Sequence, residues 1–96
     1  MDVHELLREK REDILQIAFK HGVTHIRIFG SAARGESAEN SDIDFLIEVN
    51  GPTTPWFPGS LVAELEKLLG RRVDVVEPEA IRKPLRERIL QEAVPL

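Results

Sequence analysis

The run Asp42-Ile43-Asp44 limits the possible folds of this chain more than any other stretch. It opens an apolar segment that reaches Val49, a pattern typical of a β-strand. Successive strand side chains point to opposite faces, so the two aspartates share one face, opposite Ile43, Phe45 and Ile47. Adjacent carboxylates repel each other and are poor strand formers. We therefore expect a positive group between them, for which a divalent metal ion is the usual choice.

A glycine–serine pair stands at the end of the preceding predicted strand, Thr24 to Phe29. Gly30-Ser31 opens a short predicted helix whose start would place free backbone N–H groups beside the exit of that strand. The Ser31 hydroxyl adds a donor, and glycine lets a phosphate approach the backbone closely. Alone, the pair would indicate a plain strand–turn–helix corner with Ser31 as the N-cap. Its pairing with Asp42 and Asp44 favours a phosphate-binding turn.

The remaining segments predict a single domain over residues 1–96, with one sheet layer and helices packed against it, in the α/β class. Helices are expected over 2–21, 31–36, 61–69 and from Pro84 onward, and strands over 24–29, 42–49 and 72–76. A long loop rich in proline and glycine spans residues 50–59. Within it, we expect Trp56 and Phe57 to pack over the edge of the core; the alternative is an exposed patch that binds a partner.

A third carboxylate, Asp74, lies in the last predicted strand and points away from Val73 and Val75. If the polar sides of the strands face the same way, Asp42, Asp44 and Asp74 converge beside Gly30-Ser31. That arrangement outlines a two-metal site for phosphoryl transfer, in which Asp42 and Asp44 hold two Mg²⁺ ions and Asp74 binds the one nearest the attacking hydroxyl. The alternatives are a solvated strand face for Asp42 and Asp44 and an exposed edge-strand residue for Asp74.

One basic residue stands close to this predicted site. Arg34 follows Ser31 by one helical turn and could reach a phosphate. It could equally pair with Glu36 or Glu39, and the spacing does not separate the two possibilities.

Composition excludes several classes of function. The formal charge of −4 argues against a general nucleic-acid binder, which needs a basic face. The chain has no cysteine, which excludes disulfides and thiolate metal sites and fits a cytoplasmic protein. It contains no apolar run long enough to span a membrane, and no secretory signal is visible.

These motifs together resemble a known superfamily. Gly30-Ser31-x-x-Arg34-Gly35 followed by Ser41-Asp42-Ile43-Asp44 is similar to the signature of the DNA polymerase β-type nucleotidyltransferases. The chain length, the segment from Leu69 to Val76 and the closing Arg86-x-x-Ile89-x-x-Glu92-Ala93-Val94 resemble, more narrowly, the minimal nucleotidyltransferases (MNT). Those proteins are the antitoxins of HEPN/MNT toxin–antitoxin pairs. The loop from Asn50 to Gly59 carries no fixed pattern of the family.

The resemblance implies a palm-like fold with a small mixed sheet, Mg²⁺ dependence and ATP as donor. It implies transfer of AMP to a tyrosine of a HEPN toxin, with Gly30, Ser31 and Arg34 at the nucleotide, and Asp42, Asp44 and Asp74 as catalytic metal ligands. The chain offers little beyond this core, so we expect the acceptor to come from a partner protein in a hetero-oligomer. Two alternatives stand beside this one: a non-catalytic antitoxin that neutralises its toxin by complex formation, and part of a nucleotidyltransferase that acts on small molecules.

Overall fold

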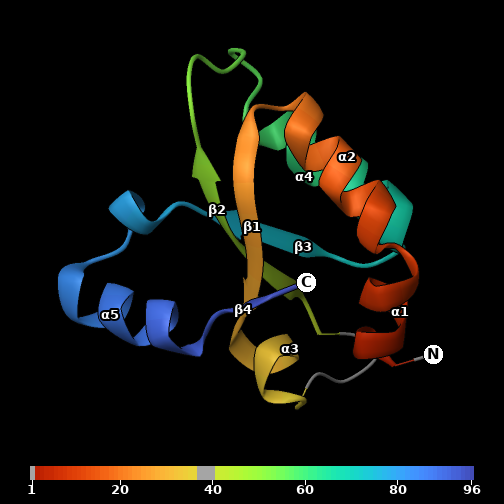
Figure 1. Cartoon of the computed structure of the whole chain (residues 1–96), viewed down its shortest axis with the longest axis vertical. Coiled ribbons are helices and arrows are strands. Elements are labelled where there is room, and N and C mark those ends of the chain that lie inside the picture. The colour runs from red at the N-terminus through yellow and green to blue at the C-terminus, as the bar shows by residue number, and fades with distance from the viewer. Residues whose placement is uncertain (1, 37–40) are drawn as a thin grey trace.

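The computed structural model describes residues 2–36 and 41–96, which form one layer of mixed sheet with helices on both faces (Figure 1). The strands are β1 (Val23–Phe29), β2 (Ile43–Val49), β3 (Val73–Val76) and β4 (Val94–Pro95). The helices are α1 (Val3–Glu9), α2 (Arg11–Lys20), α3 (Gly30–Arg34), α4 (Gly59–Leu69) and α5 (Lys83–Glu92), with a 3₁₀ turn, η1 (Pro78–Ala80). The predicted α/β class is confirmed.

The sheet has the order β3-β2-β1-β4. β1 runs antiparallel to β2 and to β4, whereas β2 and β3 are parallel. This combination is the mixed sheet that the family resemblance implies. The strand β4, two residues at the edge of the sheet, was not predicted.

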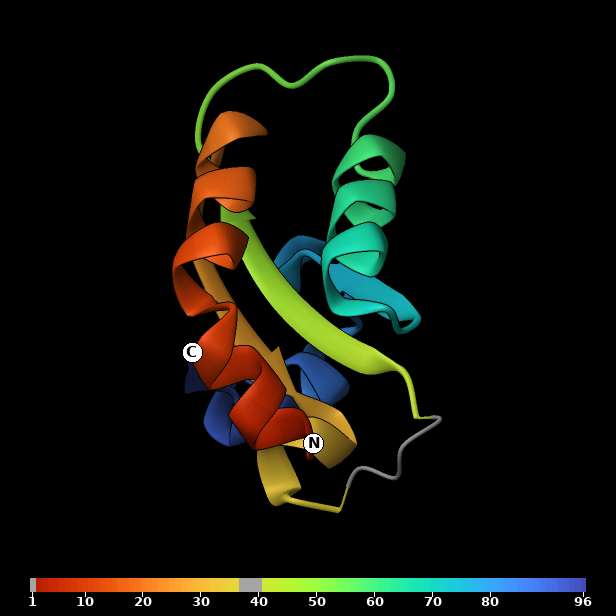
Figure 2. The same cartoon turned by 90° about the vertical axis from the view of Figure 1, so that its right-hand side faces the viewer.

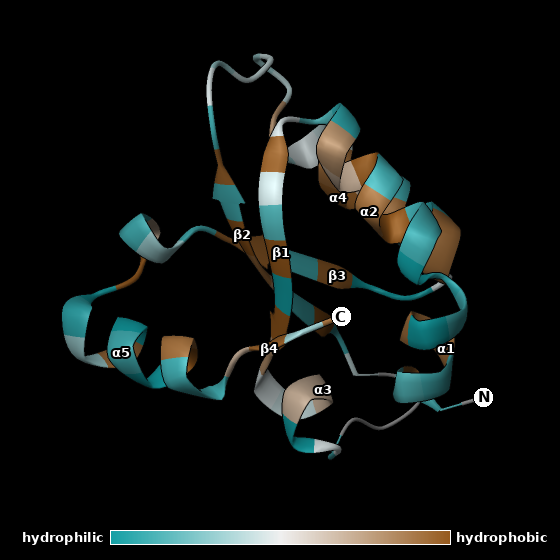
Figure 3. Cartoon of the chain, in the orientation of Figure 1, coloured by the Kyte–Doolittle hydropathy of each residue, from teal (hydrophilic) through white to brown (hydrophobic). Residues whose placement is uncertain are grey.

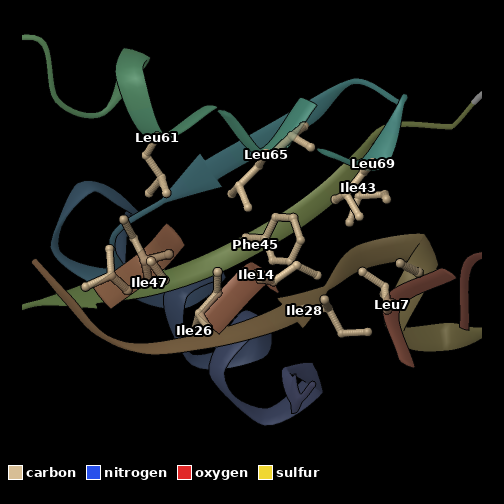
Figure 4. Packing of buried hydrophobic residues seen from close by; sticks show 14 of the residues in the cluster. Leu7, Ile14, Ile26, Ile28, Ile43, Phe45, Ile47, Leu61, Leu65 and Leu69 are labelled. Atoms are coloured by element: carbon tan, nitrogen blue, oxygen red, sulfur yellow. The ribbon is translucent and has the colours of Figure 1, made fainter. Parts of the chain in front are cut away.

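The core lies on one face of the sheet, under α2 and α4 (Figure 2). Ile43, Phe45 and Ile47 are fully buried there, as their alternation with Asp42 and Asp44 predicts. Phe45 occupies the centre of the cluster, between Leu65 of α4 and Ile14 of α2 (Figure 4). Replacing a buried phenylalanine by alanine costs about 3–5 kcal/mol, so this cluster anchors the strand that carries Asp44.

The N-terminal segment differs from the single helix expected over residues 2–21. It forms two helices that meet at Lys10, whose backbone (φ −97°, ψ 7°) closes α1 and opens α2. No glycine or proline lies between residues 2 and 21 to signal this break. The end of α2 is as predicted, because His21 caps it and Gly22 follows with a positive φ.

The loop after β2 corrects a second expectation. Phe57 packs against the core as predicted, but the side chain of Trp56 is 77% exposed. The expectation that both aromatic residues cover the edge of the core is therefore wrong for Trp56. The loop arches from the end of β2 over to α4, as Figure 2 shows.

The other face of the sheet is covered only in part, by η1 and α5 (Figure 1). Hydrophobic residues line the facing sides of α2 and α4, whereas much of α5 is hydrophilic (Figure 3). Two side chains are buried on this face, Leu46 of β2 and Ile81 at the start of the turn into α5. In the described part of the chain, no helix is both long and apolar enough to cross a bilayer.

Candidate active site

Two of the three predicted carboxylates lie side by side on the half-covered face of the sheet. Asp44 of β2 is the register partner of Asp74 of β3 in the parallel pair, and both line one cleft. Strand partners on one face lie about 5 Å apart. The alternation of Ile43, Phe45, Val73 and Val75 into the core turns both aspartates to the opposite face. The predicted convergence of these two carboxylates thus follows from the parallel register.

Asp42 stands one residue before β2, exposed, at the same end of the strand as Asp44. Its charge contributes to raising the pKa of the Asp44 carboxyl, so the two groups lie within electrostatic reach of each other. Across residues 2–36 and 41–96, however, no three carboxylate or imidazole side chains are gathered closely enough to form a ready-made metal cluster. Among the described residues, Asp42, Asp44 and Asp74 therefore do not form a compact three-carboxylate cluster.

The surroundings of Asp44 favour the protonated form of its carboxyl. Partial burial raises its pKa above the ordinary value, and the negative charges of Asp74 and Asp42 raise it further. Arg34 acts in the opposite direction. A divalent cation relieves this repulsion, and carboxylate oxygens are the ligands that Mg²⁺ prefers. The chemistry of the donor set therefore fits a divalent ion.

Gly30 lies directly against Asp44. Gly30 has a φ of +70°, and a Cβ built on it would stand 2.5 Å from Oδ2 of Asp44. We expected the missing side chain to let a phosphate approach, but the space beside Gly30 Cα already holds the Asp44 carboxylate. The glycine is required in order to seat that carboxylate at the corner between β1 and α3.

Ser31 is the second residue of α3, and Phe29 is the N-cap, with no side-chain cap hydrogen bond. The alternative that Ser31 caps the helix is therefore wrong. Both Ser31 and the backbone N–H groups of the first turn stand at the end of β1, beside the strand that carries Asp44.

Arg34 closes α3 and forms two ion pairs. Its Nε donates to Oε2 of Glu36 at 3.1 Å, and its Nη1 donates to Oε1 of Glu92 at the end of α5. These hydrogen bonds raise the pKa of Arg34 above its ordinary value. Of the two carboxylates named from the sequence, Glu36 pairs with Arg34, and Glu39 lies outside the described residues. Glu92 was not predicted as a partner, because it is 58 residues away in the chain.

The cleft beside the aspartates was also missed by the sequence analysis. It has a volume of about 660 Å³ and lies between the sheet and the η1–α5 segment. Asp44 and Asp74 line it, together with the apolar side chains of Phe29, Val76, Ile81, Leu85 and Ile89. The spacing of Leu85 and Ile89 predicts an apolar face on α5, and that face lines one side of the cleft.

Comparison with known proteins agrees with this geometry. The nucleotidyltransferase domain family matches residues 7–96. A protein of Methanocaldococcus jannaschii, provisionally named a protein adenylyltransferase, is 43% identical over 94 residues that cover 98% of this chain and 97% of the relative. The protein adenylyltransferase MntA of Thermococcus cleftensis is 30% identical over 97% of this chain and 91% of its own length.

Solved structures give the same result. One provisionally described as a minimal nucleotidyltransferase is 44% identical and superposes with a TM-score of 0.88, covering 100% of this chain and 97% of its own. A toxin–antitoxin complex with AMP-PNP contains a chain with the same fold, at 21% identity and a TM-score of 0.74, with coverage of 88% of this chain and 69% of the other. The resemblance that the motifs carry is thus confirmed. The chain belongs to the nucleotidyltransferase domain family and is an enzyme of its minimal nucleotidyltransferase branch.

Proposed function

We propose that this enzyme transfers AMP from ATP to a hydroxyl group, that of a tyrosine, on a partner toxin of the HEPN class, and thereby acts as its antitoxin. The relatives named as protein adenylyltransferases support AMP transfer to a protein. Neighbours described as toxin–antitoxin complexes, one of them with AMP-PNP, support a toxin partner and a nucleotide substrate.

The observation that carries the proposal is the register of Asp44 with Asp74 beside Gly30. A pure binding module has no need for two adjacent carboxylates, because their repulsion destabilises the folded state. Nucleotidyl transfer does need them, because negative charge develops on the oxygens around the phosphorus and must be offset.

In this proposal, different residues of the chain bind the phosphates and accept the proton. The Ser31 hydroxyl and the first backbone N–H groups of α3 donate hydrogen bonds to the phosphates of ATP, and Arg34 pairs with a phosphate oxygen. The acceptor oxygen attacks the α-phosphorus, the bond to the bridging oxygen breaks, and pyrophosphate leaves with the electron pair. Asp74 accepts the proton that the acceptor hydroxyl loses.

The three carboxylates also give the site its capacity for metal ions. Asp42 and Asp44 would hold two Mg²⁺ ions and Asp74 the one nearest the acceptor; bound there, the ions would supply positive charge that offsets the negative charge developing on the leaving group. Chelation by excess EDTA should therefore abolish transfer, and added Mg²⁺ should restore it.

The test combines the purified enzyme with ATP, Mg²⁺ and the product of the neighbouring open reading frame, followed by intact-mass measurement of both proteins. A mass gain of one or more AMP units on the partner, absent with Asp42→Asn, supports the proposal. A partner that keeps its mass in the presence of the wild-type enzyme contradicts it.

A second candidate function is neutralisation by complex formation without catalysis. It is favoured by two large side chains that stand free of the core, Phe19 (82% exposed) and Trp56 (77% exposed), since such residues are enriched in interfaces. A toxin that is silenced equally by the wild type and by Asp42→Asn, with no change of mass, would establish this alternative.

A further inference from the structure

The cleft between the sheet and α5 has a charged floor and largely apolar walls. Its floor is made by the carboxylates of Asp44 and Asp74, and its walls are mainly apolar, with Phe29 and Val76 from the sheet and Leu85 and Ile89 from α5. Arg82, the N-cap of α5, also lines it. Leu85 is 51% exposed, so the chain itself does not fill the space between these walls. An apolar recess of this size that ends at reactive carboxylates has the character of a binding site.

The cleft lies on the acceptor side of the aspartates. Of the described residues, Asp44 contacts both the Gly30 corner and the cleft, whereas Gly30, Ser31 and Arg34 do not line the cleft. In phosphoryl and nucleotidyl transfer, the attacking and leaving oxygens stand roughly in line, on opposite sides of the phosphorus. With the departing phosphates at the Ser31 corner, the acceptor must approach from the other side of Asp44, which is where the cleft opens.

The composition of the cleft selects among possible occupants. An adenine ring could donate from its N6 amino group to a carboxylate, but its ring-nitrogen acceptors would be left unpaired against apolar walls. Serine and threonine hydroxyls lie too close to their own backbone to extend past apolar walls. A phenol combines an apolar body with one polar tip, and its O–H donates to a carboxylate. Of these three groups, the phenol best complements both the walls and the floor.

We propose that the cleft binds the side chain of the acceptor tyrosine of the partner protein, with its ring between Leu85 and Val76 and its hydroxyl at Asp74. This assignment rests on the proposed function and extends it by naming the acceptor site. The phenolic oxygen forms the bond to the α-phosphorus as the bond to the bridging oxygen breaks, pyrophosphate leaves with the electron pair, and the proton passes to Asp74 and then to solvent.

The structure holds α5 in position as the outer wall of this site. Arg86 donates from Nε and Nη2 to the carbonyl oxygen of Ile81, at 3.2 and 2.9 Å, and so fixes the turn that leads into the helix. At the other end of the helix, the Glu92–Arg34 ion pair joins α5 to α3. Leu85 and Ile89 lie between these two attachments, so the apolar wall is set before an acceptor arrives.

A binding experiment tests the site without catalysis. The enzyme is labelled at its isoleucine, leucine and valine methyl groups and titrated with N-acetyl-tyrosinamide, with N-acetyl-serinamide as the matched probe. We expect the tyrosine probe to shift the methyl resonances of Ile81, Leu85 and Ile89, and to leave those of Leu61 and Leu65 in the core unchanged. The proposal would be overturned if AMP-PNP shifted these cleft methyl resonances and the tyrosine probe did not reverse the shifts, because the cleft would then be the adenine site.

A kinetic experiment uses two leucines of the same helix. Leu85→Asn should raise KM for the partner protein about tenfold, with kcat changed less than about twofold and the Kd for AMP-PNP unchanged, because it weakens binding of the ring equally in the ground state and the transition state. Leu90→Asn changes a residue outside the cleft lining and should leave all three constants as in the wild type. Equal KM values for Leu85→Asn and the wild type would overturn the cleft assignment while leaving the transfer activity intact. Absence of transfer by the wild type would instead contradict the proposed function, and the methyl shifts would still decide the occupant of the cleft.

Discussion

Gly30 and Asp44 are in such close contact that any Cβ at position 30 would stand 2.5 Å from Oδ2 of the aspartate. Gly30 begins α3 directly after β1, and it lies near Asp44 of β2 because Phe29, the last residue of β1, is the register partner of Asp44. The glycine thus secures the position of a carboxylate, in addition to allowing the backbone its left-handed conformation.

Gly30→Ala should therefore abolish nucleotidyl transfer in a protein that still folds. The new Cβ displaces the Asp44 carboxylate, and the left-handed φ costs about 1–3 kcal/mol of stability. Gly70→Ala is the matched control: its φ of +67° is nearly the same, but nothing lies within 4 Å of its Cβ position. That variant should lose comparable stability in thermal unfolding and keep its transfer rate. Equal rates for the two variants would show that the contact with Asp44 is unimportant.

Asp44→Asn should stabilise the folded protein at neutral pH in the absence of divalent ions. The pKa of Asp44 is raised in the folded state, so the folded protein holds this proton more tightly than the unfolded chain does. Stability of the wild type therefore falls as pH rises from the ordinary aspartate pKa through the raised one, and the asparagine variant escapes this loss. Thermal unfolding at about pH 7 should give a Tm a few degrees higher for the variant, and the difference should shrink near pH 4. Glu87→Gln, on the exposed surface of α5, should show neither effect.

Arg34→Gln should weaken ATP binding by about 10- to 100-fold, the range expected for loss of one hydrogen-bonded pair with a charged group. The measurement is the Kd for AMP-PNP by calorimetry. Arg88→Gln removes an equal charge from an exposed position of α5 and should leave the Kd within about twofold, since surface charges are screened. Unchanged affinity in Arg34→Gln would confine the role of Arg34 to its ion pairs with Glu36 and Glu92.

Trp56 and Phe57 should respond differently to truncation, although they are adjacent in sequence. Phe57→Ala removes a side chain that packs against the core and should cost roughly 1–3 kcal/mol, whereas Trp56→Ala should change stability by less than about 0.5 kcal/mol. Chemical denaturation measures both. A destabilisation of Trp56→Ala as large as that of Phe57→Ala would show that the loop packs more closely than its exposure indicates.

Most of the fold could be predicted from local patterns. The alternation in β1, β2 and β3 gave the face of each side chain, and glycines correctly placed the ends of α2, α3 and α4. The break at Lys10 and the strand β4 could not be predicted in this way. The strand β4 forms by pairing with β1, which is distant in sequence, and no alternating run predicts it. The break at Lys10 carries no glycine or proline that would predict it.

The candidate site could be predicted only where its parts are periodic. Strand alternation predicts the shared face of Asp44 and Asp74, and the register of β2 with β3 agrees with it. The catalytic role of these two residues and of Asp42 stays a prediction. Glu92 and the cleft depend instead on where α5 lies. The spacing of Leu85 and Ile89 defines an apolar helix face, but periodicity does not specify what that face packs against. In this chain it faces a cleft rather than the core.

The most direct test of this account is the rate of AMP transfer to the partner protein by Asp44→Asn, measured in a single turnover with Mg²⁺ and saturating ATP. The account places the negative charge of Asp44 at the centre of the site, so we predict a loss of at least about 1,000-fold in a protein whose unfolding is as cooperative as that of the wild type. Transfer at a rate within tenfold of the wild type would contradict the assignment of the Asp44–Asp74 pair as the catalytic centre.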